Sequence, residues 1–465
     1  MRIAIILSLG ATLLTGCMVG PAFEEPEVEA PAQYRFDPGQ LDSLGNLAWW
    51  ELFQDTLLHR LIDSALANNY NVRVAAARIE EARAFAGFSE ADLYPQIDIS
   101  ANVLRGNAQQ GPFKLGSEIT NIGFAPTLTW DIGFWGRFRR ANRAAQQQLL
   151  GAQYAQRSIM IDLISEVSSA YFLLVGLDAQ LAIARNTAQT REDATALIRA
   201  RFERGIAAEI DLNQAEIQQA IAEAAIPIFE RQVAQTENAL GVLLGQPVMN
   251  ILRDSLDQQV LPPAIPPGLP ANLLARRPDI QEFYFNLAAQ HEQIGIAEAL
   301  RLPSISISAM FGVASNDLPS LFTAEGIAWN VAGGLFGPLF NWGQNLRRVE
   351  IQEAVYDQVL LNYYQRVLVA FQEVENALVG IQTYRDETDA RLFQLRAADN
   401  AVRLSRARYY GGETSYLEVL ESERQQFSAA LEAAAAYTEQ LIAYVQLYKA
   451  LGGGWISEAE RAASQ

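Results

Sequence analysis

Few side chains in this sequence are of the types that perform catalysis or bind soft metals. The 465 residues include one cysteine, Cys17, and two histidines, His59 and His291. A single cysteine cannot form a disulfide within the chain, and these residues are too few and too far apart for a Cys/His zinc site. No P-loop glycine–lysine run, Gly-x-Ser-x-Gly elbow or His-Glu-x-x-His pair occurs. We therefore expect no enzymatic activity, no cofactor and no metal site.

The acidic residues are the other candidates for chemistry. There are 53 acidic and 35 basic side chains, which gives a net charge of −18. Nucleic-acid binding needs a basic face, so we expect no nucleic-acid partner. Glu418 and Glu421 are three residues apart and share a face if the segment is helical. Acids at the start of a helix also interact favourably with the helix dipole, and Asp211 fits this simpler explanation equally well.

The N-terminus has the pattern of an export signal. A positive start at Met1-Arg2 precedes an apolar stretch over 3–14 and the run Leu14-Thr15-Gly16-Cys17. This run resembles the lipobox of bacterial lipoproteins, which predicts a signal peptide over 1–16, a lipidated Cys17 and an extended segment over 17–56. Met18 stands where an aspartate would favour inner-membrane retention, so the resemblance implies the outer membrane. The alternative is an ordinary secretory peptide with an incidental cysteine.

The sequence repeats itself at an offset of about 207 residues. The anchors are Pro95 with Pro303 at 208 and, at 207, Trp135-Gly136 with Trp342-Gly343, Glu166-Val167 with Glu373-Val374, Gly205 with Gly412, and Leu244-Gly245 with Leu451-Gly452. Chance matches would scatter in offset, so we interpret the chain as one duplicated unit. The expected segments are a first repeat at 57–246, a proline-rich linker at 247–271, a second repeat at 272–454 and a tail at 455–465.

Each repeat contains two segments in which apolar and polar residues alternate. They lie near 96–103 and 120–130, and again near 304–310 and 327–335. This period of two predicts strands with one apolar face, and about ten such residues with nearby tryptophans suit a membrane-spanning strand. A soluble sandwich is the alternative, although Pro126 would be awkward in one of its central strands.

The best candidate for a membrane-spanning helix, 159–177, is interrupted by Asp162 and Glu166. A part of this chain that spans a membrane would therefore consist of strands.

Long helical patterns follow the strand segments. Residues 138–202 and 344–410 contain no proline and carry apolar residues at steps of three and four, which predicts helices about 100 Å long with coiled-coil seams. Shorter patterns flank them, and two short helices stacked end to end would match one long helix. The short patterns cover 57–92, 209–244, 272–301 and 416–451, with a kink expected at Pro227. A cytoplasmic coiled coil is the alternative, but it does not fit the export signal.

Four strands cannot close a barrel, for which about eight is the practical minimum in membranes. An open strand edge in lipid is not tolerated, so the chain has to oligomerise. Two copies would give eight strands and a filled interior. Three copies would give twelve strands and twelve helical staves, and a ring of such helices spaced about 10 Å apart leaves a tunnel roughly 28 Å wide.

Several motifs carry a family resemblance. They are Trp49-Trp50 with Phe53, Leu57 and Leu61-Ile62, the block Leu274-Ala275-Arg276-Arg277-Pro278-Asp279-Ile280, the run from Ile294-Gly295-Ile296-Ala297 to Leu302-Pro303, and the closing Leu447-Tyr448-Lys449-Ala450-Leu451-Gly452-Gly453-Gly454-Trp455. Together they resemble the outer membrane factor family of the TolC/OprM type, and within it the NodT subfamily of lipoproteins that serve resistance-nodulation-division (RND) efflux systems. Phe283-Tyr284-Phe285 departs from the small and acidic residues typical of that position.

The resemblance implies a mainly α fold with a small membrane β-barrel. Three copies would form a 12-stranded barrel in the bacterial outer membrane, continuous with a long α-helical barrel in the periplasm. The protein would be the passive exit duct of a tripartite RND-type efflux pump for small molecules. Its partners would be a periplasmic adaptor, an inner-membrane pump and, through the acyl anchor, outer-membrane lipid. The alternatives are a type I secretion duct and a lipid-anchored periplasmic coiled-coil scaffold.

The resemblance also assigns roles to the two glycine turns. Arg204-Gly205-Ile206 and Gly411-Gly412-Glu413 interrupt helical patterns, and in the family such turns form the tip that meets the adaptor. Gly205, Ile206 and Gly412 are therefore expected at this contact, although they fit plain tight hairpins too.

Asp211, Glu418 and Glu421 fall where the family has an acidic gate, and threefold symmetry would gather nine carboxylates there. The family's acidic pair is aspartate, whereas this chain has glutamate. Arg408 and Tyr409 would hold the closed state through hydrogen bonds between helices.

Overall fold

The structure is a computed structural model that describes residues 18–36, 49–107, 118–247, 250–262 and 270–453. Cys17, the signal peptide and the tail therefore lie outside the described residues. Two compact units divide the chain, one of 1–28, 77–153 and 282–364 and the other of 29–76, 154–281 and 365–465. Each unit takes segments from both repeats, and each of the two long helices contributes residues to both units.

The helices and strands follow the order of the repeats. The helices are α2 (Trp49–Leu52), α3 (Thr56–Asn68), α4 (Tyr70–Ala91), α5 (Arg137–Glu203), α6 (Glu209–Leu243), α7 (Pro270–Arg276), α8 (Pro278–Ala299), α9 (Gln344–Tyr410) and α10 (Tyr416–Ala450). The strands are β1 (Gln96–Asn107), β2 (Glu118–Asp131), β3 (Ser304–Ser315) and β4 (Ile327–Phe336). Short 3-10 turns lie at Leu256–Gln258 and Ala324–Gly326.

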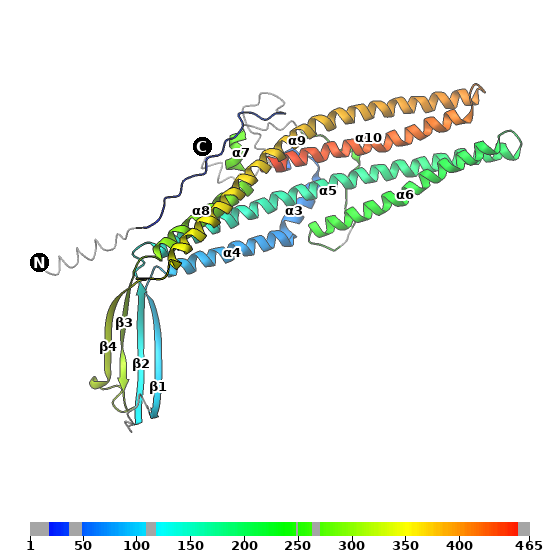
Figure 1. Cartoon of the computed structure of the whole chain (residues 1–465). Coiled ribbons are helices and arrows are strands. Elements are labelled where there is room, and N and C mark those ends of the chain that lie inside the picture. The colour runs from blue at the N-terminus through cyan, green and yellow to red at the C-terminus, as the bar shows by residue number, and fades with distance from the viewer. Residues whose placement is uncertain (1–17, 37–48, 108–117, 248–249, 263–269, 454–465) are drawn as a thin grey trace. The chain divides into compact units, whose positions relative to one another are not determined.

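The four strands form one antiparallel sheet in the order β1-β2-β3-β4 (Figure 1). The four predicted strands are confirmed, and each is somewhat longer than the alternating pattern indicated. Pro126 lies in β2 opposite Ile99 of β1, whereas the pairing of β2 with β3 is interrupted between Phe124 and Thr127. The interruption removes the conflict expected for Pro126, because a proline has no N–H to donate to β3.

One face of the sheet is apolar and open to solvent in the single chain. The register aligns Ile97 with Leu128, Ala309 with Val331 and Phe311 with Trp329. The large side chains of this face are mostly exposed: Ile97 and Ile99 on β1, Phe124 on β2, Phe311 on β3, and Trp329, Val331 and Leu335 on β4. An isolated sheet in water would not keep such a face uncovered.

The N-terminal segment is fixed beside the start of α5 within the same unit. The Arg140 side chain is 3% exposed, and its Nε donates to the Val19 carbonyl at 2.7 Å. Its Nη2 donates to the Pro21 carbonyl at 3.1 Å and its Nη1 to Glu292 at 2.8 Å. A buried guanidinium thus satisfies two backbone carbonyls of an extended segment and is neutralised by a carboxylate.

The long helices agree closely with the sequence pattern. α9 has the predicted bounds, and α5 extends one residue beyond the pattern at each end. The pattern expected over 57–92 is broken at Asn69, and the one over 272–301 begins earlier and is broken at Arg277. Pro227 lies inside α6, which continues as one helix past it.

Within its described residues, the chain has one helix long and apolar enough to cross a membrane by length and composition. It is α5, and 61% of its most apolar window is buried inside the protein. Such burial is equally typical of a core helix, so this finding is weak evidence for a membrane span.

Candidate functional site

Both helix-reversing turns depend on a glycine in the left-handed region. Gly205 has φ +71°, and the N–H of Ile206 donates to the Arg201 carbonyl at 2.9 Å. Gly412 has φ +76°, and the N–H of Glu413 donates to the Arg408 carbonyl at 2.9 Å. These hydrogen bonds satisfy carbonyls left free at the helix ends, and glycine accepts positive φ without steric cost.

Both turns are open to solvent. The Ile206 side chain is 65% exposed, and a Cβ added at Gly205 or Gly412 would meet no atom within 4 Å. The three residues predicted for a partner contact therefore lie at the ends of two helical hairpins, α5/α6 and α9/α10, which Figure 1 shows as separate antiparallel pairs.

The predicted acidic residues Glu418 and Glu421 are each neutralised by an arginine of their own hairpin. Arg408 Nη1 donates to Glu418 at 2.7 Å, and Thr414 also donates to that carboxylate. Arg424 binds Glu421 through two hydrogen bonds of 2.9 and 2.7 Å. Hydrogen bonds from Arg424 and Gln425 hold the pKa of Glu421 at about 2.

Asp211 lies in the first turn of α6, as Glu418 lies in the first turn of α10. The structure thus places each acid immediately after its turn, as predicted. A role for Asp211 in favourable interaction with the helix dipole remains equally compatible with this position.

Tyr409 joins the two hairpins. Arg201 of α5 donates to the Tyr409 hydroxyl at 2.8 Å, and its guanidinium lies 5.4 Å from the centre of the Tyr409 ring. Arg408 of α9, predicted to act with Tyr409, binds Glu418 of α10. Both residues thus form a hydrogen bond between helices, Tyr409 across the two hairpins and Arg408 within its own hairpin, and a role of these bonds in holding a closed state stays a prediction.

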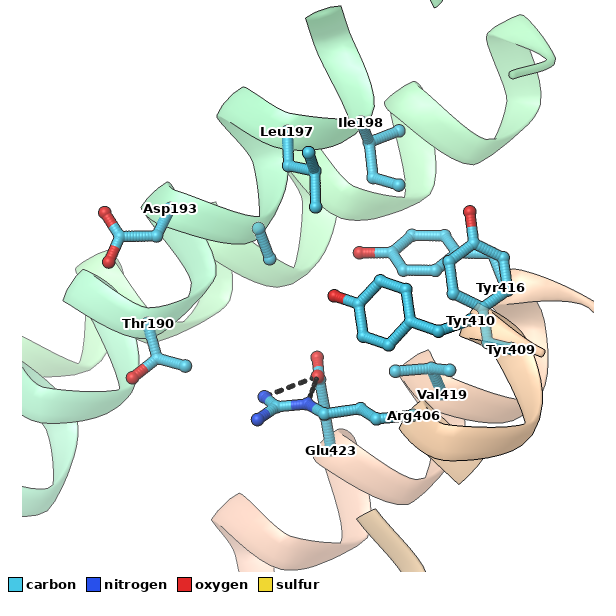
Figure 2. Close-up of a pocket in the computed structure, with 11 residues that line it drawn as sticks. Thr190, Asp193, Leu197, Ile198, Arg406, Tyr409, Tyr410, Tyr416, Val419 and Glu423 are labelled. Atoms are coloured by element: carbon cyan, nitrogen blue, oxygen red, sulfur yellow. Dashed lines mark hydrogen bonds and ion pairs between the residues drawn. The ribbon is translucent and has the colours of Figure 1, made fainter. Parts of the chain in front are cut away.

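A cavity of about 330 Å³ lies between the two hairpins (Figure 2). Thr190, Asp193, Leu197 and Ile198 line one side, and Arg406, Tyr409, Tyr410, Tyr416, Val419 and Glu423 line the other. Arg406 binds Glu423 through hydrogen bonds of 2.9 and 2.7 Å. Burial raises the pKa of the Tyr416 hydroxyl well above its usual value, so this phenol is neutral at physiological pH.

Arg191 forms a second link between the hairpins. It is 4% exposed, its Nη1 donates to the Gln218 carbonyl at 2.6 Å, and its Nη2 lies 3.5 Å from the Glu423 carbonyl. Its guanidinium also lies 5.0 Å from the centre of the Phe427 ring. Burial lowers the pKa of Arg191, yet an arginine stays charged. Two carbonyls and a ring face replace part of its hydration, while its buried Nε has no hydrogen-bond partner among the described residues.

The sequence did not single out Arg191, Arg201 or Arg406. Their partners are far away in the chain, and helical periodicity does not reveal them. One signal was available for Arg406, because the offset of 207 relates the Arg406–Glu423 pair to Arg199 and Glu216, which bind each other at 2.7 Å.

The sequence profile of the outer membrane efflux protein family matches residues 61–246 and 269–453. The chain belongs to the outer membrane efflux protein family. The matched segments contain both hairpins and all four strands.

Similar proteins come from several efflux systems. The chain is 33% identical to the cation efflux system protein CusC of Escherichia coli, over 96% of this chain and 97% of that one. It is 31% identical to the probable efflux pump outer membrane protein TtgC of Pseudomonas putida, over 99% and 98% of the two chains. The open-state structure of the MtrE outer membrane channel of Neisseria gonorrhoeae superposes with a TM-score of 0.86, covering 94% of this chain and 98% of that one at 29% identity.

These findings establish the class of this outer membrane efflux protein. It is a mostly helical outer membrane protein of an efflux system, as its sequence predicted. Proteins of this family are channel components and not enzymes.

Proposed function

We propose that three copies of the chain close into a 12-stranded outer-membrane barrel that continues as a periplasmic helical barrel. The four-stranded sheet is the observation that supports this proposal. β1 and β4 are its edges, and its apolar face is exposed in the single chain. Closure removes the edges and gives the apolar face to lipid, whereas one copy satisfies neither requirement. An acyl chain on Cys17 would add a second membrane attachment.

The assembled trimer would be the exit duct of a tripartite RND-type pump. An inner-membrane pump would supply the energy, and a periplasmic adaptor would contact Gly205, Ile206 and Gly412 at the two exposed turns. The similarity to MtrE, whose structure is an open channel, supports a tip that opens.

The nature of the cargo is a separate question. CusC is a cation efflux protein, but this chain has only 5 Met, 2 His and 1 Cys. We therefore favour small organic molecules as cargo over soft metal ions.

The native mass of the detergent-extracted mature protein tests the assembly. We expect a trimer that forms conducting channels in planar lipid bilayers. A stable monomer would leave two strand edges unpaired in lipid. It would favour the lipid-anchored scaffold instead.

The acidic residues near the turns would form the closed gate. Glu418→Ala/Glu421→Ala removes two carboxylates per copy, which leaves Arg424 without its Glu421 partner and Arg408 with only the exposed Glu413 at 3.9 Å. We therefore expect the cation preference of the channel to fall and to turn toward anions, measured as the reversal potential in a KCl gradient. Glu80→Ala on α4 removes an acid paired in the same way with Arg83 and should not shift the potential. Wild-type selectivity in the double variant would remove these residues from the gate.

A further inference from the structure

The segment that follows Cys17 has no helix or strand of its own, and we define its residues 18–28 as the strap. Contacts that do not depend on pH hold its first half. The N–H of Val19 donates to the Trp135 carbonyl at 3.2 Å, and the buried Arg140 donates to two carbonyls of the strap. An arginine stays charged at physiological pH, so mild acidification leaves this half bound.

Aromatic rings hold the second half of the strap. The Phe23 ring lies 5.8 Å from the ring of Tyr284 and 5.4 Å from the ring of His291, both on α8. Tyr356 of α9 contacts His291 at 5.9 Å, and the Tyr284 hydroxyl donates to Glu25 of the strap at 3.3 Å. The rings meet edge to face, which is a favoured arrangement of aromatic pairs.

Tyr284 belongs to Phe283-Tyr284-Phe285, the run that departs from the family pattern. The structure gives this departure a role, because Tyr284 supplies one ring of the site that receives the strap. A small or acidic side chain at this position would offer no ring to Phe23. The aromatic site is therefore a feature of this chain and not of the family pattern.

His291 supplies the imidazole of this site. It is 5% exposed, and its buried Nδ1 has no hydrogen-bond partner among the described residues. Burial lowers the pKa of His291 below its usual value of about 6.5. The charge of Arg140 adds to this effect, whereas Glu292 and a hydrogen bond with the Ala22 backbone partly oppose it. The docked strap therefore favours the neutral imidazole.

Other ionisable groups face this site from every element packed against it. Carboxylates ordinarily titrate near pH 4 and guanidinium groups above pH 12, so a range of about pH 5.5–7.5 isolates the imidazole. Burial raises the pKa of the Tyr284 and Tyr356 hydroxyls, so both phenols stay neutral in this range. The charged groups are Glu24 and Glu25 on the strap, Arg140 on α5, Glu292 on α8 and Asp357 on α9.

We propose that His291 makes the docking of the strap dependent on pH, because the neutral imidazole receives Phe23 and the protonated imidazole releases the second half of the strap. A proton on Nδ1 would place a charge in a buried position without an acceptor, whereas undocking gives this nitrogen to water. Docking is therefore strongest above about pH 6.5. It weakens as the pH falls below this value, by at most about tenfold per pH unit for one proton.

Release would change what the protein exposes without detaching it from the membrane. The first half of the strap stays bound to Arg140, next to the lipid-carrying position, while the Tyr284 and Tyr356 rings lose their cover. All these contacts lie within one copy. The inference therefore goes beyond the proposed trimer and does not depend on it.

A spin label at Glu27→Cys tests the proposal in the full-length, detergent-solubilised protein. Glu27 is an exposed residue of the strap, and protein without an added cysteine gives the blank for Cys17, the chain's single native cysteine. The mobile fraction of the EPR spectrum should rise several-fold from about pH 7.5 to about pH 5.5 and fall again on return. The same label at Glu80→Cys on α4 should not respond. Equal mobile fractions of the strap label at both pH values would overturn the proposal.

Uncharged variants identify the group that titrates. His291→Phe keeps a ring against Phe23 and Tyr356 but cannot bind a proton, so the mobile fraction should stay low at both pH values. His291→Gln, which can still donate to the Ala22 backbone, is a second uncharged variant and should also give a fraction independent of pH. Phe23→Ala removes the docked ring and should give a large mobile fraction at both values. A response of the wild-type size in either His291 variant would exclude His291 as the sensor.

The other histidine of the chain provides the matched control. His59 lies in the other compact unit, where its ring contacts Trp49 at 5.2 Å. His59→Phe removes one titrating imidazole as His291→Phe does, yet it should keep the full response of the strap label. Loss of the response in His59→Phe would contradict the assignment to His291.

Discussion

At the scale of single residues, the Asp279 carboxylate of the family motif Arg277-Pro278-Asp279 is bound by two arginines, Arg277 and Arg366. Arg277, 3% exposed, donates to its two carboxylate oxygens at 3.0 and 2.6 Å, and Arg366 Nε donates at 2.6 Å. Burial alone would raise the pKa of Asp279, but the hydrogen bonds and charges of both arginines outweigh burial and hold the pKa at about 2. The charged form is therefore the one that stabilises the fold.

Asp279→Asn tests this stabilisation. Removing the Asp279 charge leaves the buried Arg277 and its neighbour Arg366 with Glu373 as their shared carboxylate, so we expect a loss of about 3 kcal/mol at pH 7. Asp162→Asn is the control, because its ion pair with Lys449 is about 40% exposed and should contribute at most about 1 kcal/mol. The comparison uses thermal unfolding of the detergent-solubilised protein.

The same variant has a defined pH dependence. The folded pKa of Asp279 lies below its unfolded value, so the stabilisation is present above about pH 4 and is lost as the pH falls toward about 2. The shift corresponds to about 2 kcal/mol. The gap between wild type and Asp279→Asn should therefore narrow over this range, and a constant gap would contradict the assignment.

At the scale of elements, the sequence predicted the long helices and the strands because their periodicity extends over many residues. It did not predict the break at Asn69, although a signal was present. The Asn69 side chain accepts from the N–H of Asn71 at 2.8 Å and of Val72 at 3.3 Å, which caps α4. Pro278 at the first position of α8 marks the second break in a similar way. The apolar spacing continues across both positions, so the pattern predicted one helix in each place where the structure has two.

The candidate site was only partly predictable for a different reason. Positions relative to a turn are local, so Gly205, Gly412 and the acids after them were found from the sequence. The Arg201–Tyr409 hydrogen bond joins residues 208 positions apart, and such a contact depends on how the hairpins pack. For Arg408 the sequence predicted a hydrogen bond between helices, which the bond to Glu418 of α10 provides, but it did not identify the partner.

At the scale of the whole molecule, the two faces of the sheet differ in polarity and suit different surroundings. Trp329 of β4 is 72% exposed and pairs with Phe311, which is 66% exposed on the same apolar face. Its neighbour Asn330 pairs with Met310 and points to the other face. In a closed barrel the first face meets lipid and the second lines the lumen, whereas in a periplasmic scaffold both would meet water.

Arginine substitutions at adjacent positions in the middle of β4 distinguish the two arrangements. Val331→Arg, on the same face as Trp329 and fifth of the ten residues of β4, would place a charge in lipid at a cost of about 2–4 kcal/mol per copy, and a trimer would incur this cost three times. We expect a large loss of trimers from the outer-membrane fraction. Asn330→Arg lies at almost the same depth but faces the lumen, so its yield should stay close to that of the wild type. A scaffold in water would tolerate both, and equal yields of membrane-inserted trimer would therefore contradict the barrel.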